Sequence, residues 1–111
     1  MHGYPNLHFL LGPNTALGHN SVLYMVERQV EYVVQALRLL KARNARSLEP
    51  TAASQAAFVQ GIDQAFAGTA WSGCDSWYRN ASGDNIALWT ASSYAYRRAL
   101  KTLRIDDFHI A

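Results

Sequence analysis

Residues 12–21, GPNTALGHNS, separate a short apolar run from a long stretch with helical spacing. The apolar run, residues 7–11, is bounded by Pro5-Asn6 and Gly12-Pro13, which is typical of a strand buried on both faces. A parallel strand of this kind needs neighbours on both edges and a layer on each face. No second run of that type occurs, so the sequence predicts one strand made for a larger sheet.

Two long helices are predicted downstream of this loop. The first spans about residues 20–43, where either Asn20 or Ser21 can cap the first turn and Asn44 is suited to a left-handed stop. The second opens at Pro50-Thr51 and ends at Gly68. The predicted apolar stripe of the first helix comprises Val22, Val26, Val30, Val33, Leu37 and Leu40.

The rest of the chain predicts smaller elements. Residues 77–79 and 85–89 indicate two short strands joined by a turn, and residues 92–103 indicate a closing helix. The predicted fold class is therefore α+β: a mainly helical chain with one N-terminal sheet strand, two long helices, a short β-hairpin and a C-terminal helix. We expect a single domain over residues 1–111.

Composition excludes several classes of function. A formal net charge of +2 is too small to indicate nucleic-acid binding by itself. No apolar run approaches the roughly 18 residues of a membrane span, and no secretory signal is recognisable, so we expect a cytoplasmic protein without membrane contact. The single cysteine, Cys74, fits a reducing compartment. No metal site is expected, because His2, His8 and His109 have no ligand spacing.

The loop of residues 12–21 has two interpretations. A turn between a strand and a helix gathers backbone N–H groups and the positive end of a helix dipole, which suits an anion or an electron-rich carbonyl. It lacks both the G-x-G-x-x-G spacing of a dinucleotide site and the lysine of a P-loop, so an ordinary capped turn is the other interpretation. His19 could donate to a ligand, although loop and cap roles are commoner.

The aromatic side chains near the C-terminal half also have two interpretations. Tryptophan and tyrosine combine a large apolar body with a polar tip, so they can pack on a cofactor or in a core. Core or interface packing is the commoner outcome. A similar choice applies to Cys74, for which a structural thiol is favoured over a nucleophile. The aromatic group comprises Trp71, Trp77, Tyr78 and Trp89.

Four segments taken together resemble a known family. They are GYPNLHFLLGPNTALGHNS (3–21), ERQVEYV (27–33), SGCDSWYRNASGDNIALW (72–89) and YAYRRAL (94–100). They are similar, in order, to the C-terminal portion of FAD- and NADPH-dependent flavoprotein monooxygenases of the Baeyer-Villiger and flavin-containing type. The family pattern is similar to F-P-N-L-F-x-L-x-G-P-N-T-G-x-G-H-N-S followed by G-G-C-x-S-W-Y.

This resemblance implies roles for particular positions. Residues 1–70 would be the C-terminal segment of the FAD-binding domain, and residues 71–111 the aromatic hairpin and terminal helix. The helix that begins near Asn20 would point at the pyrimidine edge of the flavin, and no catalytic residue is assigned. The implied cofactor-binding residues are Gly12, Pro13, Asn14, Thr15 and Asn20 for the flavin, and Trp77 for NADP.

Departures from the family pattern limit what the resemblance implies. Ala16 replaces a usual glycine, Ser72 replaces the first glycine before the cysteine, and Thr90 stands where a proline is usual. Both glycine-rich fingerprints are absent, so we expect that FAD and NADPH are not bound by this chain alone. The expected partners are a second copy of the chain or the missing N-terminal half of an enzyme.

Two functions are consistent with these features. The first is the C-terminal segment of a flavin-dependent monooxygenase that oxygenates a ketone or a soft heteroatom and is inactive alone. The second is a non-catalytic module of the same descent that associates with itself or with a partner.

Overall fold

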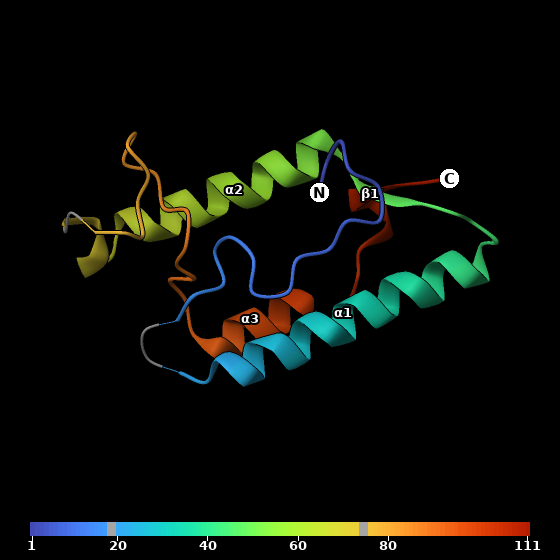
Figure 1. Ribbon diagram of the computed structural model, residues 1–111, viewed down its shortest axis with the longest axis horizontal. Helices are drawn as coiled ribbons and strands as arrows, with labels where there is room; N and C mark the ends of the chain where they lie inside the picture. Colours follow the sequence, from blue (N-terminus) through green and yellow to red (C-terminus); the bar gives the residue numbers. More distant parts are fainter. Residues whose placement is uncertain (18–19, 74–75) are drawn as a thin grey trace.

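The computed structural model describes residues 1–17, 20–73 and 76–111. These ranges contain three helices, α1 (Val22–Ala42), α2 (Ala52–Ala67) and α3 (Ser93–Leu100), and two short strands, β1 (Leu48–Pro50) and β2 (Phe108–Ile110). Two 3₁₀ helices, Ala70–Gly73 and Ile105–Asp107, complete the α+β fold. Figure 1 shows α1 and α2 as two arms, with the N-terminal loop between them and α3 lying along α1.

Side chains cap the first turns of both long helices. Of the two candidates at the start of α1, Ser21 is the cap and accepts from the Tyr24 amide at 3.4 Å. Thr51, at the predicted start of the second helix, caps α2 by accepting from the Ser54 amide at 3.1 Å. Asn44 has a φ of 49°, so the left-handed stop after α1 is confirmed. Gly68 is the C-cap of α2 but has a φ of −87°, so that helix ends without a left-handed residue.

The buried face of α1 differs from the predicted apolar stripe. Its buried residues are Met25, Gln29 and Ala36, and Gln29 bonds to Leu11 of the N-terminal loop and to Tyr96 of α3. Two members of the predicted stripe, Val30 and Leu37, are 44% and 57% exposed. The stripe is therefore only partly buried: Val22, Val30 and Leu37 are exposed, whereas Val26, Val33 and Leu40 are half-buried.

The predicted N-terminal strand is wrong for this structure. Residues 7–11 form no strand, and Leu10 and Leu11 are each 51% exposed. An extended segment needs a neighbouring strand to bond its amides, and the described residues place none beside it. Leu11 instead adopts a φ of 56°, which ends any extended run before Gly12.

The predicted hairpin is largely absent. One antiparallel bridge, Arg79↔Asn85, joins its two arms, and the second arm pairs with the N-terminal loop through the parallel bridge Ala16↔Leu88. The closing helix is shorter than predicted, because the Leu103 amide donates to the side chain of Gln35 at 2.9 Å rather than continuing α3. In both cases the backbone bonds to a distant part of the chain, residue 16 for the hairpin and Gln35 for the closing helix, instead of to its predicted local partner.

The two-stranded sheet was not predicted. β1 and β2 pair antiparallel with Leu48 opposite Ile110, and each strand has three residues, too few to show alternation. The sheet brings the C-terminal Ala111 beside Ser47, just before β1, and Asp107 beside Thr51 at the start of α2. It therefore closes the end of the molecule opposite the aromatic segment.

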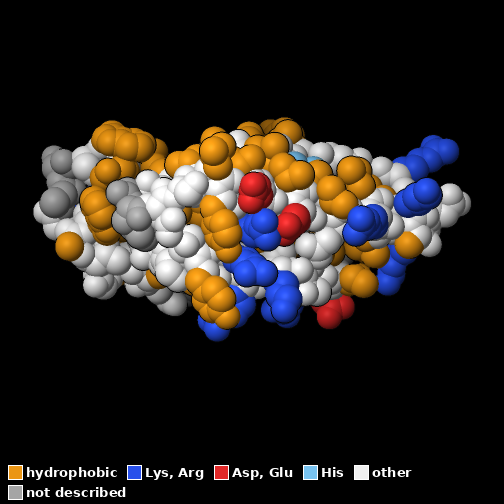
Figure 2. Space-filling model, turned by 90° about the horizontal axis from the view of Figure 1, so that it is seen from below, with side chains coloured by type: hydrophobic (Ala, Val, Ile, Leu, Met, Phe, Trp, Pro, Cys, Tyr) orange, Lys and Arg blue, Asp and Glu red, His pale blue; other side chains and the backbone are white. Residues whose placement is uncertain are grey.

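Apolar side chains also cover much of the surface. Figure 2 shows several hydrophobic areas between the charged groups of one face. Across the whole molecule, the exposed large side chains include Phe9, Leu23, Phe58, Val59 and Trp77. No helix in the described ranges is both long and apolar enough to cross a membrane.

Tyr32 should make stability depend on pH. Burial, and then the negative charge of Asp107, raise its pKa to about 12. The unfolded value is about 10, so the stabilisation is complete below about pH 10 and is lost as the pH rises towards 12. Urea unfolding at stepped pH should show a steeper loss for the wild type than for Tyr32→Phe. Tyr94→Phe, at an exposed position, is the control, and equal slopes for wild type and Tyr32→Phe would contradict the assignment.

Candidate functional site

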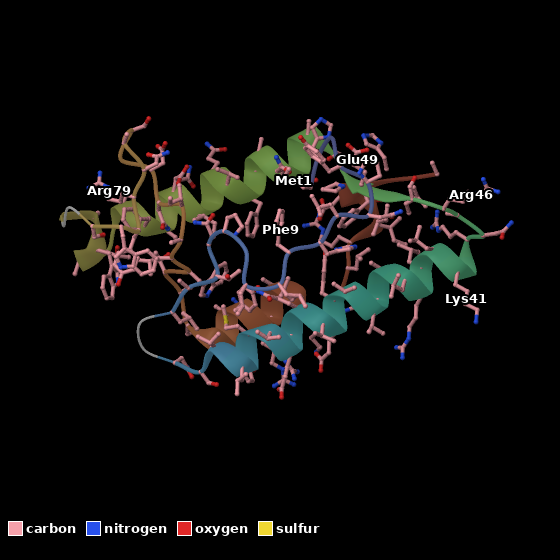
Figure 3. All side chains as sticks on the ribbon, in the orientation of Figure 1. Met1, Phe9, Lys41, Arg46, Glu49 and Arg79 are labelled. Carbon is pink, nitrogen blue, oxygen red and sulfur yellow. The ribbon has the colours of Figure 1, made fainter. Side chains whose placement is uncertain are left out.

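The loop after residue 11 has a defined backbone shape. Leu11 and Asn14 have φ values of 56° and 57°, and the Thr15 hydroxyl donates to the Gly12 carbonyl at 2.6 Å. A Cβ atom on Gly12 would lie 2.5 Å from the Cβ of Phe9, so no larger residue fits there without movement. Figure 3 shows Phe9 in the space between the loop and α2. Glycine is therefore required by packing inside the loop.

Residues 85–89 hold the loop from the other side. The amides of Asn14 and Ala16 donate to the carbonyls of Ile86 at 3.3 Å and Ala87 at 2.9 Å. The Trp89 amide donates back to the Ala16 carbonyl at 3.0 Å. A segment more than 70 positions later thus supplies partners that a neighbouring strand would otherwise provide.

Asn85 stiffens that supporting segment. Its side chain is buried, donates to the Leu88 carbonyl at 2.8 Å and accepts from the Leu88 amide at 2.9 Å. The Asn14 side chain donates to the Asn85 carbonyl at 2.9 Å. Loop and support are therefore connected by side chains as well as by backbone.

One pocket gathers most of the predicted cofactor-binding residues. It has a volume of about 510 Å³, within the range of small-molecule sites. The first residue of α1, Val22, lies in its wall, so the positive end of the helix dipole is at the pocket. Four of the predicted residues, Gly12, Pro13, Thr15 and Trp77, share this wall with Leu11, Ala16, Val22, Ile86 and Ala87.

Trp77 also lines this pocket, although it comes from a segment that is distant from the loop in the sequence. Its side chain is 71% exposed and its ring centroid lies 4.3 Å from that of Tyr78. The indole therefore contacts Tyr78 while most of Trp77 remains exposed. Its apolar face is available to a planar ligand.

Two other predicted residues have structural partners and do not line this pocket. The Asn14 amide group is bonded to Asn85 and Leu88, and the Asn20 side chain donates to the Ser93 hydroxyl at 2.7 Å. Nothing in these contacts tests their predicted cofactor roles. Gly18, His19 and Cys74 lie outside the described residues.

The ionisable groups near the loop give it a neutral character. Burial, and then the N-terminal ammonium, lower the pKa of His8, which favours an uncharged imidazole. Within the described ranges, no three His, Cys, Asp or Glu side chains are grouped closely enough to hold a metal ion. The pocket wall is mainly apolar and contains the first residue of α1, so the pocket is suited to binding an apolar, planar group with an electron-rich edge.

Sequence reasoning missed two residues of this site. Gln29 accepts from the Leu11 amide at 2.9 Å, and Asn85 braces residues 87 and 88. Both are buried polar side chains within apolar surroundings. The position of Gln29, four residues after Met25 and seven before Ala36, is the signal that could have placed it on the buried face.

Curated relatives match the chain over nearly its whole length. A Baeyer-Villiger monooxygenase of Pseudomonas aeruginosa is 40% identical, covering 97% of this chain and 21% of the relative. A Baeyer-Villiger monooxygenase of Streptomyces coelicolor is 32% identical, with the same coverage. An FAD-binding monooxygenase of Aspergillus niger is 29% identical over 94% of this chain and 18% of the relative. No family model matches.

The fold comparison agrees with these relatives. An oxidized steroid monooxygenase bound to NADP superposes with a TM-score of 0.86 and 25% identity, covering 99% of this chain and 22% of that one. The chain spans about a fifth of the length of the relatives it matches. It is homologous to a C-terminal portion of flavoprotein monooxygenases of the Baeyer-Villiger type.

Two glycine substitutions should have opposite effects on stability. Gly12→Ala forces its Cβ against Phe9, and overpacking of this kind costs ~1–3 kcal/mol. Gly61→Ala, inside α2, has no atom within 4 Å of the new Cβ and should stabilise by up to about 1 kcal/mol. Chemical denaturation of both variants measures the difference. An unchanged or increased stability of Gly12→Ala would contradict the tight contact between Gly12 and Phe9.

Proposed function

We propose that the chain forms the flavin-facing wall of an FAD- and NADPH-dependent monooxygenase that oxygenates a ketone or a soft heteroatom. The supporting observation is the pocket that unites Gly12, Pro13 and Thr15 with Trp77 at the N-terminus of α1. Relatives named FAD-binding monooxygenases and a structural neighbour bound to NADP support the two cofactors. The chain spans about a fifth of its relatives, and on its own it is not expected to retain FAD or to be active.

The pocket fits a flavin ring on physical grounds. Gly12 presents backbone without a side chain, and the wall around it is mainly apolar. The N-terminus of α1 lies at this wall, and the positive end of its dipole favours an electron-rich ring edge. The flavin supplies the redox chemistry, while this chain binds the ring, orients its edge and excludes water from one side.

Trp77 is proposed to contact the nicotinamide cofactor. It lies on the same pocket as the loop but comes from a separate segment, and most of its side chain is exposed. An exposed aromatic face beside a flavin site can stack on a second planar group.

The proposed cellular setting is the cytoplasm, and the single cysteine of the sequence is compatible with it.

A non-catalytic binding module is the alternative function. The observation that favours it is the exposed apolar surface of α1 and α2, which includes Leu23, Leu37, Phe58 and Val59. Such a surface is typical of contact with another protein part. It suits either a second copy of this chain or the region that precedes the matching segment in the relatives.

A chimera can decide between these functions. Residues 1–111 would replace the matching segment of the Pseudomonas aeruginosa relative, which is 40% identical. We expect the purified chimera to keep FAD through gel filtration and to oxidise NADPH, whereas the isolated chain mixed with FAD should lose it. The unaltered relative is the control. A folded chimera without FAD would contradict the proposal and favour the binding module.

Within this chimera, Trp77→Ala should weaken NADPH binding. Loss of aromatic stacking, worth ~0.5–1.5 kcal/mol, should raise the KM for NADPH by up to about tenfold. The FAD content should stay unchanged. Trp77→Phe keeps an aromatic ring and should therefore have a KM for NADPH close to that of the wild type. Trp71→Ala is the control, since Trp71 packs on Tyr78 and does not line the pocket. Equal KM values for wild type and Trp77→Ala would exclude this contact.

A further inference from the structure

Gln29 connects the loop to α3 through a buried amide. Its side chain is 6% exposed; the Oε1 atom accepts from the Leu11 amide at 2.9 Å, and the Nε2 atom donates to the Tyr96 hydroxyl at 2.7 Å. A buried amide is costly unless both ends are bonded. The two partners are 18 and 67 positions away in sequence, so Gln29 links parts of the chain that local structure does not join.

Tyr96 extends this link to the other end of the loop. Its ring meets that of Trp89 edge-to-face with centroids 5.0 Å apart, and the Trp89 amide donates to the Ala16 carbonyl. Burial raises the pKa of Tyr96, so its hydroxyl stays protonated at neutral pH. A chain of contacts therefore runs from Leu11 through Gln29, Tyr96 and Trp89 to Ala16.

The loop needs an external support at Leu11. A φ of 56° is unfavourable for leucine, and residues 7–11 have no strand partner among the described residues. Gly12, the next residue, lies against Phe9 and lines the proposed flavin pocket. A change in the backbone at Leu11 would therefore move the pocket wall directly.

We propose that Gln29 is a positioning residue: with Tyr96, it holds the Leu11–Gly12 backbone in the shape that the flavin-facing wall requires, without contacting the flavin itself. Gln29 and Tyr96 do not line the pocket shared by Gly12 and Trp77; they line a second pocket, of about 220 Å³, which Gly12, Pro13 and Thr15 also border. Gln29 is thus separated from Trp77 and the start of α1, which supports an indirect role at that pocket. The part of this inference that concerns flavin depends on the proposed function. The part that concerns the loop depends on this chain alone.

Gln35 provides a matched control on the same helix. Its Oε1 atom accepts from the Leu103 amide at 2.9 Å, and its Nε2 atom donates to the Leu100 carbonyl at 3.3 Å. It therefore uses the same two atoms in the same way, but at the C-terminal end of α3. The two glutamines should protect different amides, Leu11 for Gln29 and Leu103 for Gln35.

Amide hydrogen exchange of the full chain tests the loop. Gln29→Leu should speed exchange of the Leu11 amide by at least about fivefold and leave the Leu103 amide unchanged, because one hydrogen bond is lost. Gln35→Leu should do the reverse. Gln29→Glu keeps an acceptor for Leu11 and should restore protection. Unchanged exchange at Leu11 in Gln29→Leu, or equal acceleration at both amides, would overturn the positioning role.

The chimera tests the flavin part separately. Gln29→Leu should alter the visible circular dichroism of bound FAD, whereas Gln35→Leu should not, and Gln29→Glu should restore the spectrum. An unchanged spectrum with accelerated Leu11 exchange would overturn the link to flavin. If the wild-type chimera binds no FAD, the proposed function fails, and the exchange experiment alone decides whether Gln29 positions the loop.

Discussion

The backbone of residues 11–16 depends on hydrogen bonds from outside its own segment. The Leu11 amide donates to Gln29 of α1, the Asn14 and Ala16 amides donate to residues 86 and 87, and the Ala16 carbonyl accepts from Trp89. Unbonded backbone groups in a packed region are costly, so these partners determine where the loop lies. The pocket at the start of α1, the exposed indole of Trp77 and the position of α3 all follow from that arrangement.

The exposed apolar surface has a related cause. Residues such as Leu10, Leu23 and Phe58 are spaced as if for a packed interior, yet all three are more than half exposed. Relatives that contain this segment are about five times longer, so a larger protein has additional structure to place against such a surface. Both the surface and the proposed flavin wall agree with the proposal that the segment packs against further structure in a larger protein.

Features fixed by neighbouring residues could be predicted from sequence, and features that depend on distant partners could not. The caps at Ser21 and Thr51 and the left-handed stop at Asn44 are local, and all were predictable. The prediction of a strand at residues 7–11 was wrong because a strand forms only where a neighbouring strand bonds its backbone. Four predicted cofactor-binding residues share one pocket, but Gln29 was missed because its partners lie far away in sequence.

The most direct test of the account is a crystal structure of the FAD-bound chimera. The central claim is that this segment supplies the wall against which the flavin ring lies. We predict the isoalloxazine within van der Waals contact of Gly12, Pro13 and Thr15, with its electron-rich edge towards the N-terminus of α1. A flavin bound elsewhere, for example in the pocket lined by Tyr32, Phe58 and Phe108, would contradict this prediction.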